Sequence, residues 1–365
     1  MLTSRQAEAL NETSLPASAS AASYTQSSQP GIMIPNMTVS WHAACAPAVT
    51  VVFATRNRAA ALAPVLECFT ALKAPEGGWK LVVVDNGSSD GTSNLLRAYA
   101  DRLPLTALSE PHPGKNRALN TALPHFEGAL IVLTDDDVLP QPDWLPRLQQ
   151  AALDHPEASL FGGTVLPHWS RPRPAWLTES AVPFSVLYAQ QKRKAGPCCC
   201  DAIFGPNMAV RSSVFEAGHR FSETVGPDES QRMYAMGGET EFLRRVEAAG
   251  YTGWFVPEAV VGHIIRPEQL DEAWILQRAY RYGIGEGSHY IAHHASGDAS
   301  HYLPARLRLR GLVYGAAASL SGLVPHSALR LKIRYKARAI AGTIDGLHKA
   351  CRPALTIAVR APPSA

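Results

Sequence analysis

Three short, largely apolar runs, each ending in a polar turn, constrain the fold of this chain more than any other feature. They are Val49–Ala54, Lys80–Val84 and Ala129–Leu133, and stretches of helical composition separate them. Runs of this length without polar alternation are typical of strands buried in a parallel sheet. Strands that alternate with helices predict an α/β fold with a mostly parallel central sheet and helices on both faces.

Composition divides the 365-residue chain into three parts. Residues 1–45 are poor in charge and rich in Ser, Ala and Thr, which predicts a disordered leader. Residues 46–267 are the expected main domain, with the alternating pattern in 46–158 and a less regular half, rich in Pro, Trp and Gly, in 159–267. Residues 268–365 form a basic C-terminal extension of helical composition.

Charge is unevenly distributed along the chain. From residue 304 onward there are eleven Lys and Arg residues and one acid, Asp345, so this end carries +10 and the rest −7. A basic end of this kind predicts binding to an anionic surface, either membrane headgroups or nucleic acid. The alternative is that the basic residues face solvent and bind no partner. No basic module with interleaved aromatic residues supports nucleic acid, which leaves the membrane as the expected partner.

The structure of two segments of the extension and the redox state of the cysteines can also be predicted. The apolar run Gly311–Val324 is shorter than the roughly 20 residues that span a bilayer, and it predicts a core helix, with an interfacial helix as the alternative. Leu329–Ala339 alternates like a strand but has helical composition, so its structure stays open. The six cysteines show no zinc spacing and indicate reduced thiols in a cytoplasmic protein.

Three consecutive carboxylates, Asp135, Asp136 and Asp137, follow the third predicted strand. Adjacent like charges need a compensating cation or solvent, and hard oxygen ligands suit Mg²⁺ or Mn²⁺ bridging to a phosphate-bearing substrate. An acidic turn exposed to solvent is the alternative. Their place after a buried strand favours a site, because ligands bind at the carboxyl ends of parallel strands.

Other polar residues are expected at the same edge of the sheet. Asp85 ends the second strand and suits ribose hydroxyls or a base edge, or it initiates the turn that follows. Thr55, Arg56 and Asn57 close the first strand, and the stretch 114–117 precedes a helix. Both stretches supply donors and cations that suit a diphosphate.

Two acidic residues compete for the role of a base. Glu239 follows two glycines at a predicted helix start, where the positive end of the helix dipole supports a charged, accessible carboxylate. Helix capping by Glu239 and an i,i+4 pair between Glu241 and Arg245 are the structural alternatives. His263 follows a strand-like run and is either a metal ligand or a structural histidine.

Taken in order, these stretches resemble family 2 glycosyltransferases of GT-A fold. The resemblance covers about residues 48–267, and it rests on the order and spacing of its motifs. They read TVVFATRNR, VVVDNGSSDGT, GKNRALNTAL, LTDDDVLPQPDWL, and GGETEFLRRVEAAGY followed by VPEAVVGH. The resemblance implies a Rossmann-like fold for nucleotide-diphospho-sugar transfer.

The resemblance also implies a reaction and roles for particular residues. It implies inverting transfer from a nucleotide-diphosphate sugar, usually a UDP-sugar, to an acceptor hydroxyl. Carried over to this sequence, the family's motifs place Thr55 and Asp85 near the nucleobase and ribose. Arg117 falls where the family contacts the diphosphate. The DXD motif of the donor site corresponds to Asp135 and Asp137, with Asp136 as its variable middle residue. Asp135, Asp137 and His263 hold Mn²⁺ or Mg²⁺, Glu239 is the base, and Asn207 and Glu241 face the acceptor. Because Gly238-Glu239 replaces the usual Glu-Asp pair, Glu241 remains a competitor for the base.

The expected partners follow from the same resemblance. They are a nucleotide-diphosphate sugar and a saccharide, lipid-linked saccharide or other hydroxyl acceptor, in polysaccharide or glycolipid synthesis on the inner face of a bacterial membrane. One alternative is a catalytically silent sugar-nucleotide-binding or scaffold protein. Another is a sugar-1-phosphate nucleotidyltransferase, but residues 54–58 lack the glycines of its phosphate loop. A Rossmann oxidoreductase is excluded because no GxGxxG motif follows an early strand.

Overall fold

The computed structural model describes residues 49–226, 236–294, 305–325 and 327–358. The expected disordered leader, residues 1–45, lies outside the described residues. The described residues all belong to one compact unit, Cys45–Ala365. The division of this unit into residues 46–267 and 268–365 therefore stays a prediction.

The first half of the sheet is parallel, as predicted. Its strands run in the order β3-β2-β1-β4, and they have the bounds β1 (Val49–Thr55), β2 (Trp79–Asp85), β3 (Leu105–Ser109) and β4 (Leu130–Leu133). The sequence did not indicate β3, because this edge strand is only half-buried and lacks a continuous apolar run. The connecting helices are α1 (Ala59–Thr70), α2 (Thr92–Tyr99) and α3 (Lys115–Ala122).

Antiparallel pairs make the second half of the sheet mixed. There β8 pairs antiparallel with both β4 and β6, β6 pairs parallel with β9, and β5 and β7 pair antiparallel with β9. The bounds are β5 (Val138–Pro140), β6 (Leu160–Trp169), β7 (Gly196–Cys198), β8 (Met208–Arg211) and β9 (Gly253–Ile265). The strand-like run expected before His263 is part of β9, and a bulge opposite Gly163 and Thr164 takes up the irregular residues around Pro257.

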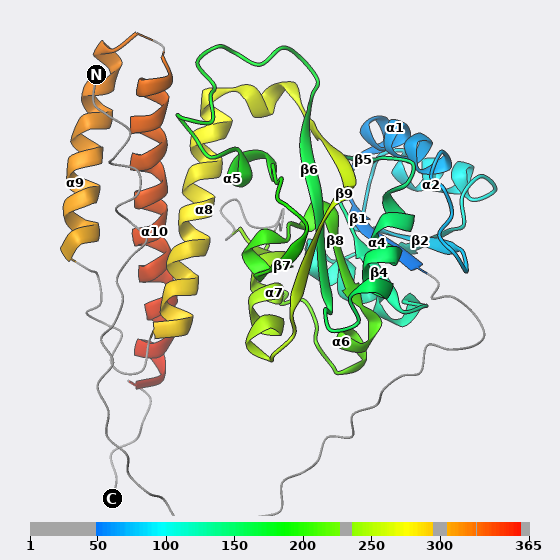
Figure 1. Cartoon of the computed structure of the whole chain (residues 1–365). Coiled ribbons are helices and arrows are strands. Elements are labelled where there is room, and N and C mark those ends of the chain that lie inside the picture. Colours follow the sequence, from blue (N-terminus) through cyan, green and yellow to red (C-terminus); the bar gives the residue numbers. More distant parts are fainter. Residues whose placement is uncertain (1–48, 227–235, 295–304, 326, 359–365) are drawn as a thin grey trace, which may run out of the picture. The chain divides into compact units, whose positions relative to one another are not determined.

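Helices cover both faces of the sheet, as predicted (Figure 1). Because side chains alternate along a strand, Val51 and Phe53 of β1 pack toward α1 and α4, whereas Val52 packs toward α3 and α7. The helices of this half are α4 (Trp144–Asp154), α5 (Phe184–Tyr188), α6 (Ser212–Glu216) and α7 (Gly238–Ala248).

The C-terminal section is helical, with α8 (Glu272–His294), α9 (Ala305–Leu320) and α10 (Ala328–Ala358). In Figure 1 α10 lies between α8 and α9. Residues 329–339, left open by the sequence, are part of α10. A separate apolar cluster joins α8 and α10 to α5, with Tyr188, Trp274 and Tyr335 among its members.

The prediction of a core helix at residues 311–324 is wrong. No residue of α9 is buried, and the Leu312 side chain is 73% exposed. The physical reason is that α9 packs against α10 on one side only, through Gly311 and Tyr314, while its apolar residues occupy other sides as well.

Glycines allow α8 and α10 to pack at backbone distance. Gly283 and Gly287 of α8 face α10, while Gly342 and Gly346 of α10 face α8. A Cβ atom at any of the four would overlap a carbonyl oxygen of the opposite helix, such as that of Tyr280 for Gly342. The close packing of these two helices therefore depends on the missing side chains.

We expect Gly342→Ala to lower the free energy of unfolding by about 2 kcal/mol or more, because the added methyl group forces the helix backbones apart. The matched control is Gly315→Ala in α9, where no atom lies within 4 Å of the new Cβ. Alanine there should leave stability unchanged or raise it by up to about 1 kcal/mol through helix propensity. Urea unfolding of both variants tests this, and equal stability of the two would contradict the packing argument.

Candidate active site

A cavity of about 1040 Å³ opens at the carboxyl ends of β1 and β4. The loops after these strands, the starts of α3 and α7, and one side of α8 contribute its walls. Ligands of open α/β sheets bind in this position. The cavity is therefore the candidate active site.

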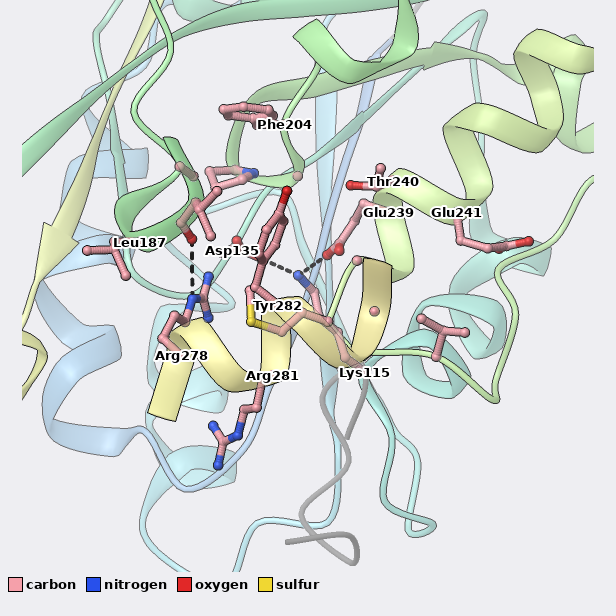
Figure 2. Close-up of a pocket in the computed structure, with 18 of the residues that line it drawn as sticks. Lys115, Asp135, Leu187, Phe204, Glu239, Thr240, Glu241, Arg278, Arg281 and Tyr282 are labelled. Atoms are coloured by element: carbon pink, nitrogen blue, oxygen red, sulfur yellow. Dashed lines mark hydrogen bonds and ion pairs between the residues drawn. The ribbon is translucent and has the colours of Figure 1, made fainter. Parts of the chain in front are cut away.

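Lys115, the first residue of α3, lies at the centre of the cavity wall. Its ammonium group donates to the carboxylates of both Asp135 and Glu239 (Figure 2). Burial alone would lower the pKa of Lys115, but the two carboxylates raise it above its usual value. The same contact lowers the pKa of Glu239 in spite of burial, so Glu239 is held ionised.

The other two carboxylates of the triplet point to different partners. Asp136 accepts a hydrogen bond from Thr55 Oγ1 at 2.8 Å and lies 3.6 Å from Arg58 Nε. Burial, together with the charge of Asp137, raises the pKa of Asp136 to about 6. Each aspartate thus has a cationic or hydroxyl partner of its own, which offsets the repulsion between neighbouring charges.

Asp137 faces a histidine and an arginine. Its carboxylate lies 3.3 Å from His263 Nε2 and 3.3 Å from Arg266. Burial disfavours the charged form, but His263 and Arg266 hold the pKa of Asp137 at about 2. Burial also lowers the pKa of His263, but the charge of Asp137 outweighs it and raises that pKa above its usual value. His263 Nδ1 lies 2.7 Å from the Tyr188 carbonyl oxygen, which fixes the ring so that Nε2 faces Asp137.

The expected metal ligands lie together, but in the described part of the chain no three His, Cys, Asp or Glu side chains form a ready metal-binding group. Asp137 and His263 face one another, whereas the Asp135 carboxylate is turned to Lys115. Carboxylate oxygens with one imidazole nitrogen form a donor set that suits Mn²⁺ or Mg²⁺ chemically. A divalent ion fits these donors once Asp135 exchanges Lys115 for the ion.

Glycines make room for Glu239 at the start of α7. Gly237 adopts a left-handed φ of 103°, and a Cβ at Gly238 would lie 2.7 Å from the side chain of Asn116. A Cβ at Gly205 would lie 3.1 Å from the Glu239 carboxyl group. The carboxylate is therefore enclosed by backbone that only glycine permits.

Glu241 borders the same cavity but points elsewhere. It forms the i,i+4 ion pair with Arg245, at 3.0 Å, that the sequence offered as its structural role. In Figure 2 it projects away from Lys115 and Asp135. Of the two competing acids, Glu239 is the one placed beside Asp135.

The residues expected at the nucleotide end are only partly brought together. Thr55 and Arg56 border the cavity, and Arg56 donates to the Asn86 carbonyl at 3.2 Å. Asp85 accepts from the Ser88 amide at 2.9 Å in the adjacent turn and is not among the residues that border the cavity. Asn57 likewise lies outside the cavity lining, with φ of 51° and its side-chain oxygen 2.8 Å from the amide of Ser89.

Two of the expected site residues do not line the cavity, and their roles stay predictions. Arg117 pairs with Glu223 at 2.9 Å and lies outside the cavity lining, because it is two residues further round α3 than Lys115. Asn207, expected at the acceptor, is fully buried. Its amide donates to the carbonyls of Thr164 and Ala259, and its oxygen accepts from Trp144 Nε1. This is a core contact without access for an acceptor.

Sequence reasoning missed the contribution of α8. Arg278 and Tyr282 project from this helix at the cavity (Figure 2), and Arg278 donates to the Val186 carbonyl at 3.4 Å. The available signal was the spacing of four residues, which places both side chains on one face of a helix. The basic extension thus supplies one wall of the site.

The profile of glycosyl transferase family 2 matches residues 50–216. The succinoglycan biosynthesis protein ExoM of Rhizobium meliloti (strain 1021) is 28% identical over 293 residues, which is 78% of this chain and 88% of that protein. The glycosyltransferase AglE of Haloferax volcanii is 26% identical over 246 residues, 66% of this chain and 73% of AglE.

A solved structure shares the fold. The mannosyltransferase PcManGT from Pyrobaculum calidifontis, in complex with GDP-Man and Mn²⁺, superposes with a TM-score of 0.53 at 21% identity. The match covers 83% of this chain and 90% of that chain. The expected GT-A fold is confirmed by this likeness.

We expect Asn207→Ala to lower the free energy of unfolding by roughly 3 kcal/mol or more, because one buried donor and two carbonyls lose their partner. Glu241→Ala is the control, since an exposed i,i+4 pair contributes only about 0.5 kcal/mol. Urea unfolding measures both values. An Asn207→Ala variant as stable as the native protein would restore Asn207 as an acceptor candidate.

Proposed function

The chain belongs to glycosyl transferase family 2, and from this we propose that it transfers a sugar from a nucleotide-diphosphate sugar, a UDP-sugar, to an acceptor hydroxyl with inversion. The observation that carries the proposal is the meeting of Asp135, Lys115 and Glu239 in one cavity at the carboxyl end of the sheet. Donor-binding and base functions need to lie within a few ångströms of one sugar carbon, and the contact of Lys115 with both carboxylates supports such an arrangement.

We propose the binding site of the nucleotide-sugar donor from the charged side chains at one end of the cavity. Arg56 and Arg58 border it and suit a nucleotide diphosphate. Asp135, Asp137 and His263 would hold Mn²⁺ or Mg²⁺, whose chemistry is to offset negative charge on the leaving diphosphate. The structure of PcManGT with GDP-Man and Mn²⁺ supports a divalent ion at such a site.

Glu239 is proposed as the general base. Its ionised carboxylate accepts the proton of the acceptor hydroxyl while that oxygen attacks the anomeric carbon and the bond to the diphosphate breaks. A single displacement of this kind inverts the configuration at the carbon. Lys115 lowers the pKa of Glu239, which keeps its carboxylate ionised before the donor binds.

Lys115 is proposed as a cation for the donor diphosphate. It lies between Asp135 and Glu239, so an incoming diphosphate and divalent ion would exchange partners with it. This replaces Arg117, the residue first expected in that role, whose side chain pairs with Glu223.

The acceptor is proposed to be a saccharide or lipid-linked saccharide in cell-surface polysaccharide or glycolipid synthesis. The similarity to a succinoglycan biosynthesis protein supports this substrate class. Within the part of the chain that the structure describes, no helix is sufficiently long and apolar to cross a bilayer. The charge of the basic C-terminal section supports the proposal that it contacts the inner face of a bacterial membrane peripherally.

Calorimetry with UDP, GDP and CMP, each with and without Mn²⁺, tests the donor site. We expect one nucleotide to bind in a metal-dependent manner and Asp137→Ala to abolish that dependence, since it removes the carboxylate opposite His263. Failure of a folded protein to bind any of the three would favour the silent scaffold.

The same titration separates the two basic residues of the α3 motif. Lys115→Met should weaken nucleotide binding about tenfold or more, because it removes a buried cation from the cavity. Arg117→Met, two residues away and outside the cavity, is the matched control and should bind as the native protein does. The opposite order of effects would return the diphosphate contact to Arg117.

With the donor identified, Glu239→Gln should lower kcat about 100- to 10,000-fold while nucleotide affinity changes little, because the amide cannot accept the proton. Glu241→Gln, its counterpart two residues along α7, should lose less than about tenfold. NMR of the product reports the anomeric configuration, and retention would contradict the single displacement. A larger loss in Glu241→Gln would make Glu241 the base.

A further inference from the structure

Helix α9 carries an apolar stripe on its solvent side, formed by Leu309, Leu312, Val313, Ala316 and Leu320. These residues recur at intervals of three and four and so share one helix face. All five are exposed, Leu312 at 73% and Leu320 at 66%. We refer to them as the outward stripe.

The opposite side of α9 is the side that packs. A Cβ at Gly311 would touch Ile340 and Ile344 of α10, and Tyr314 accepts a hydrogen bond from Lys336 Nζ at 3.3 Å. These contacts orient the helix, so the outward stripe is directed away from α10.

Exposed apolar side chains are concentrated around this helix. Eight large hydrophobic residues are exposed among the described residues, and six of them lie between Leu309 and Leu329. The other two, Leu153 and Leu166, are isolated in the main domain. A cluster of this kind on an otherwise polar surface marks a binding surface rather than the usual scatter of surface leucines.

The charges beside the stripe indicate what it binds. Arg306 and Arg310 lie on one flank and Arg308 on the other, by the 100° step of the helix, and α9 has no acidic residue. A second copy of α9 would bring like charges together on both flanks, which disfavours a dimer through this face. Phospholipid headgroups with negative charge match both the arginines and the apolar stripe.

We propose that α9 is an interfacial helix that inserts its outward stripe into the headgroup region of an anionic phospholipid membrane. Its 16 residues extend about 24 Å, and a helix with an apolar face between arginines lies in the plane of such a surface. The proposal goes beyond attraction by basic charge, because apolar side chains enter the lipid.

Membrane binding by α9 would also affect the cavity, because the helices of the C-terminal section pack against one another. Helix α10 contacts both α9 and α8, and α8 contributes Arg278 and Tyr282 to the cavity. A membrane that holds α9 would thus hold the helical section that forms one cavity wall. This last step rests on the proposed function, in which a lipid-linked acceptor reaches the cavity.

Co-sedimentation of the full chain with vesicles tests the proposal. We expect binding to vesicles of phosphatidylcholine with phosphatidylglycerol, and little binding to phosphatidylcholine alone. The double variant Leu312→Ser, Leu320→Ser should bind at least about tenfold more weakly, because two exposed leucines no longer enter the lipid. Leu153→Ser in α4, which is 41% exposed, is the matched control and should bind normally.

A second pair of variants tests the charges. Arg308→Gln and Arg310→Gln should each weaken binding to the anionic vesicles roughly fivefold. Arg97→Gln on the exposed side of α2 is the control and should have no effect. Added salt should reproduce the loss caused by the arginine variants but leave the contribution of the leucines.

Three results would overturn the proposal. They are absence of binding by the native protein, unchanged binding by the leucine double variant, and a dimer, seen by sedimentation velocity, that this variant alone abolishes. Nucleotide calorimetry on the double variant keeps the outcomes separate, because α9 is not part of the cavity. If the double variant loses vesicle binding but still binds nucleotide, the result bears on α9 alone. If vesicle binding is kept and nucleotide binding is lost, the result bears on the proposed function.

Discussion

The ammonium group of Lys115 between the carboxylates of Asp135 and Glu239 is the contact on which the site depends. A buried charge is costly unless it is paired, and here one lysine compensates two carboxylates from separate elements. The pairing joins the start of α3, the loop after β4 and the start of α7. Because Lys115 contacts both carboxylates, its removal would leave two neighbouring negative charges without their cation, and its contacts join the three elements around the cavity.

The remaining charges of the cavity follow the same rule. Three adjacent aspartates coexist because they diverge, Asp136 toward Thr55 and Arg58 and Asp137 toward His263. Backbone constraints complete the arrangement, since a side chain at position 205 would press on the Glu239 carboxyl group. The chemistry proposed for the site thus begins from the carboxylates of Glu239 and Asp137, whose lowered pKa values keep them ionised.

The C-terminal section links this site to a surface of different character. Glycines bring α8 and α10 to backbone distance, so the wall of the cavity and the helices beyond it are packed as one body of helices. On the far side of α10, α9 exposes leucines flanked by arginines. The same section therefore borders the polar cavity on α8 and presents an apolar, basic face on α9.

The sequence by itself determined the strands β1, β2 and β4, the helices between them and the edge of the sheet where polar residues gather, because buried parallel strands need continuous apolar runs. It also placed Glu239 at a helix start, since two glycines precede it. Only the tertiary structure placed Lys115 at the cavity and Arg117 beside Glu223, buried Asn207 in the core and exposed the outward stripe of α9. Each depends on contacts with residues distant in the chain, such as Glu223 for Arg117 and Trp144 for Asn207, and local patterns carry no information on such contacts.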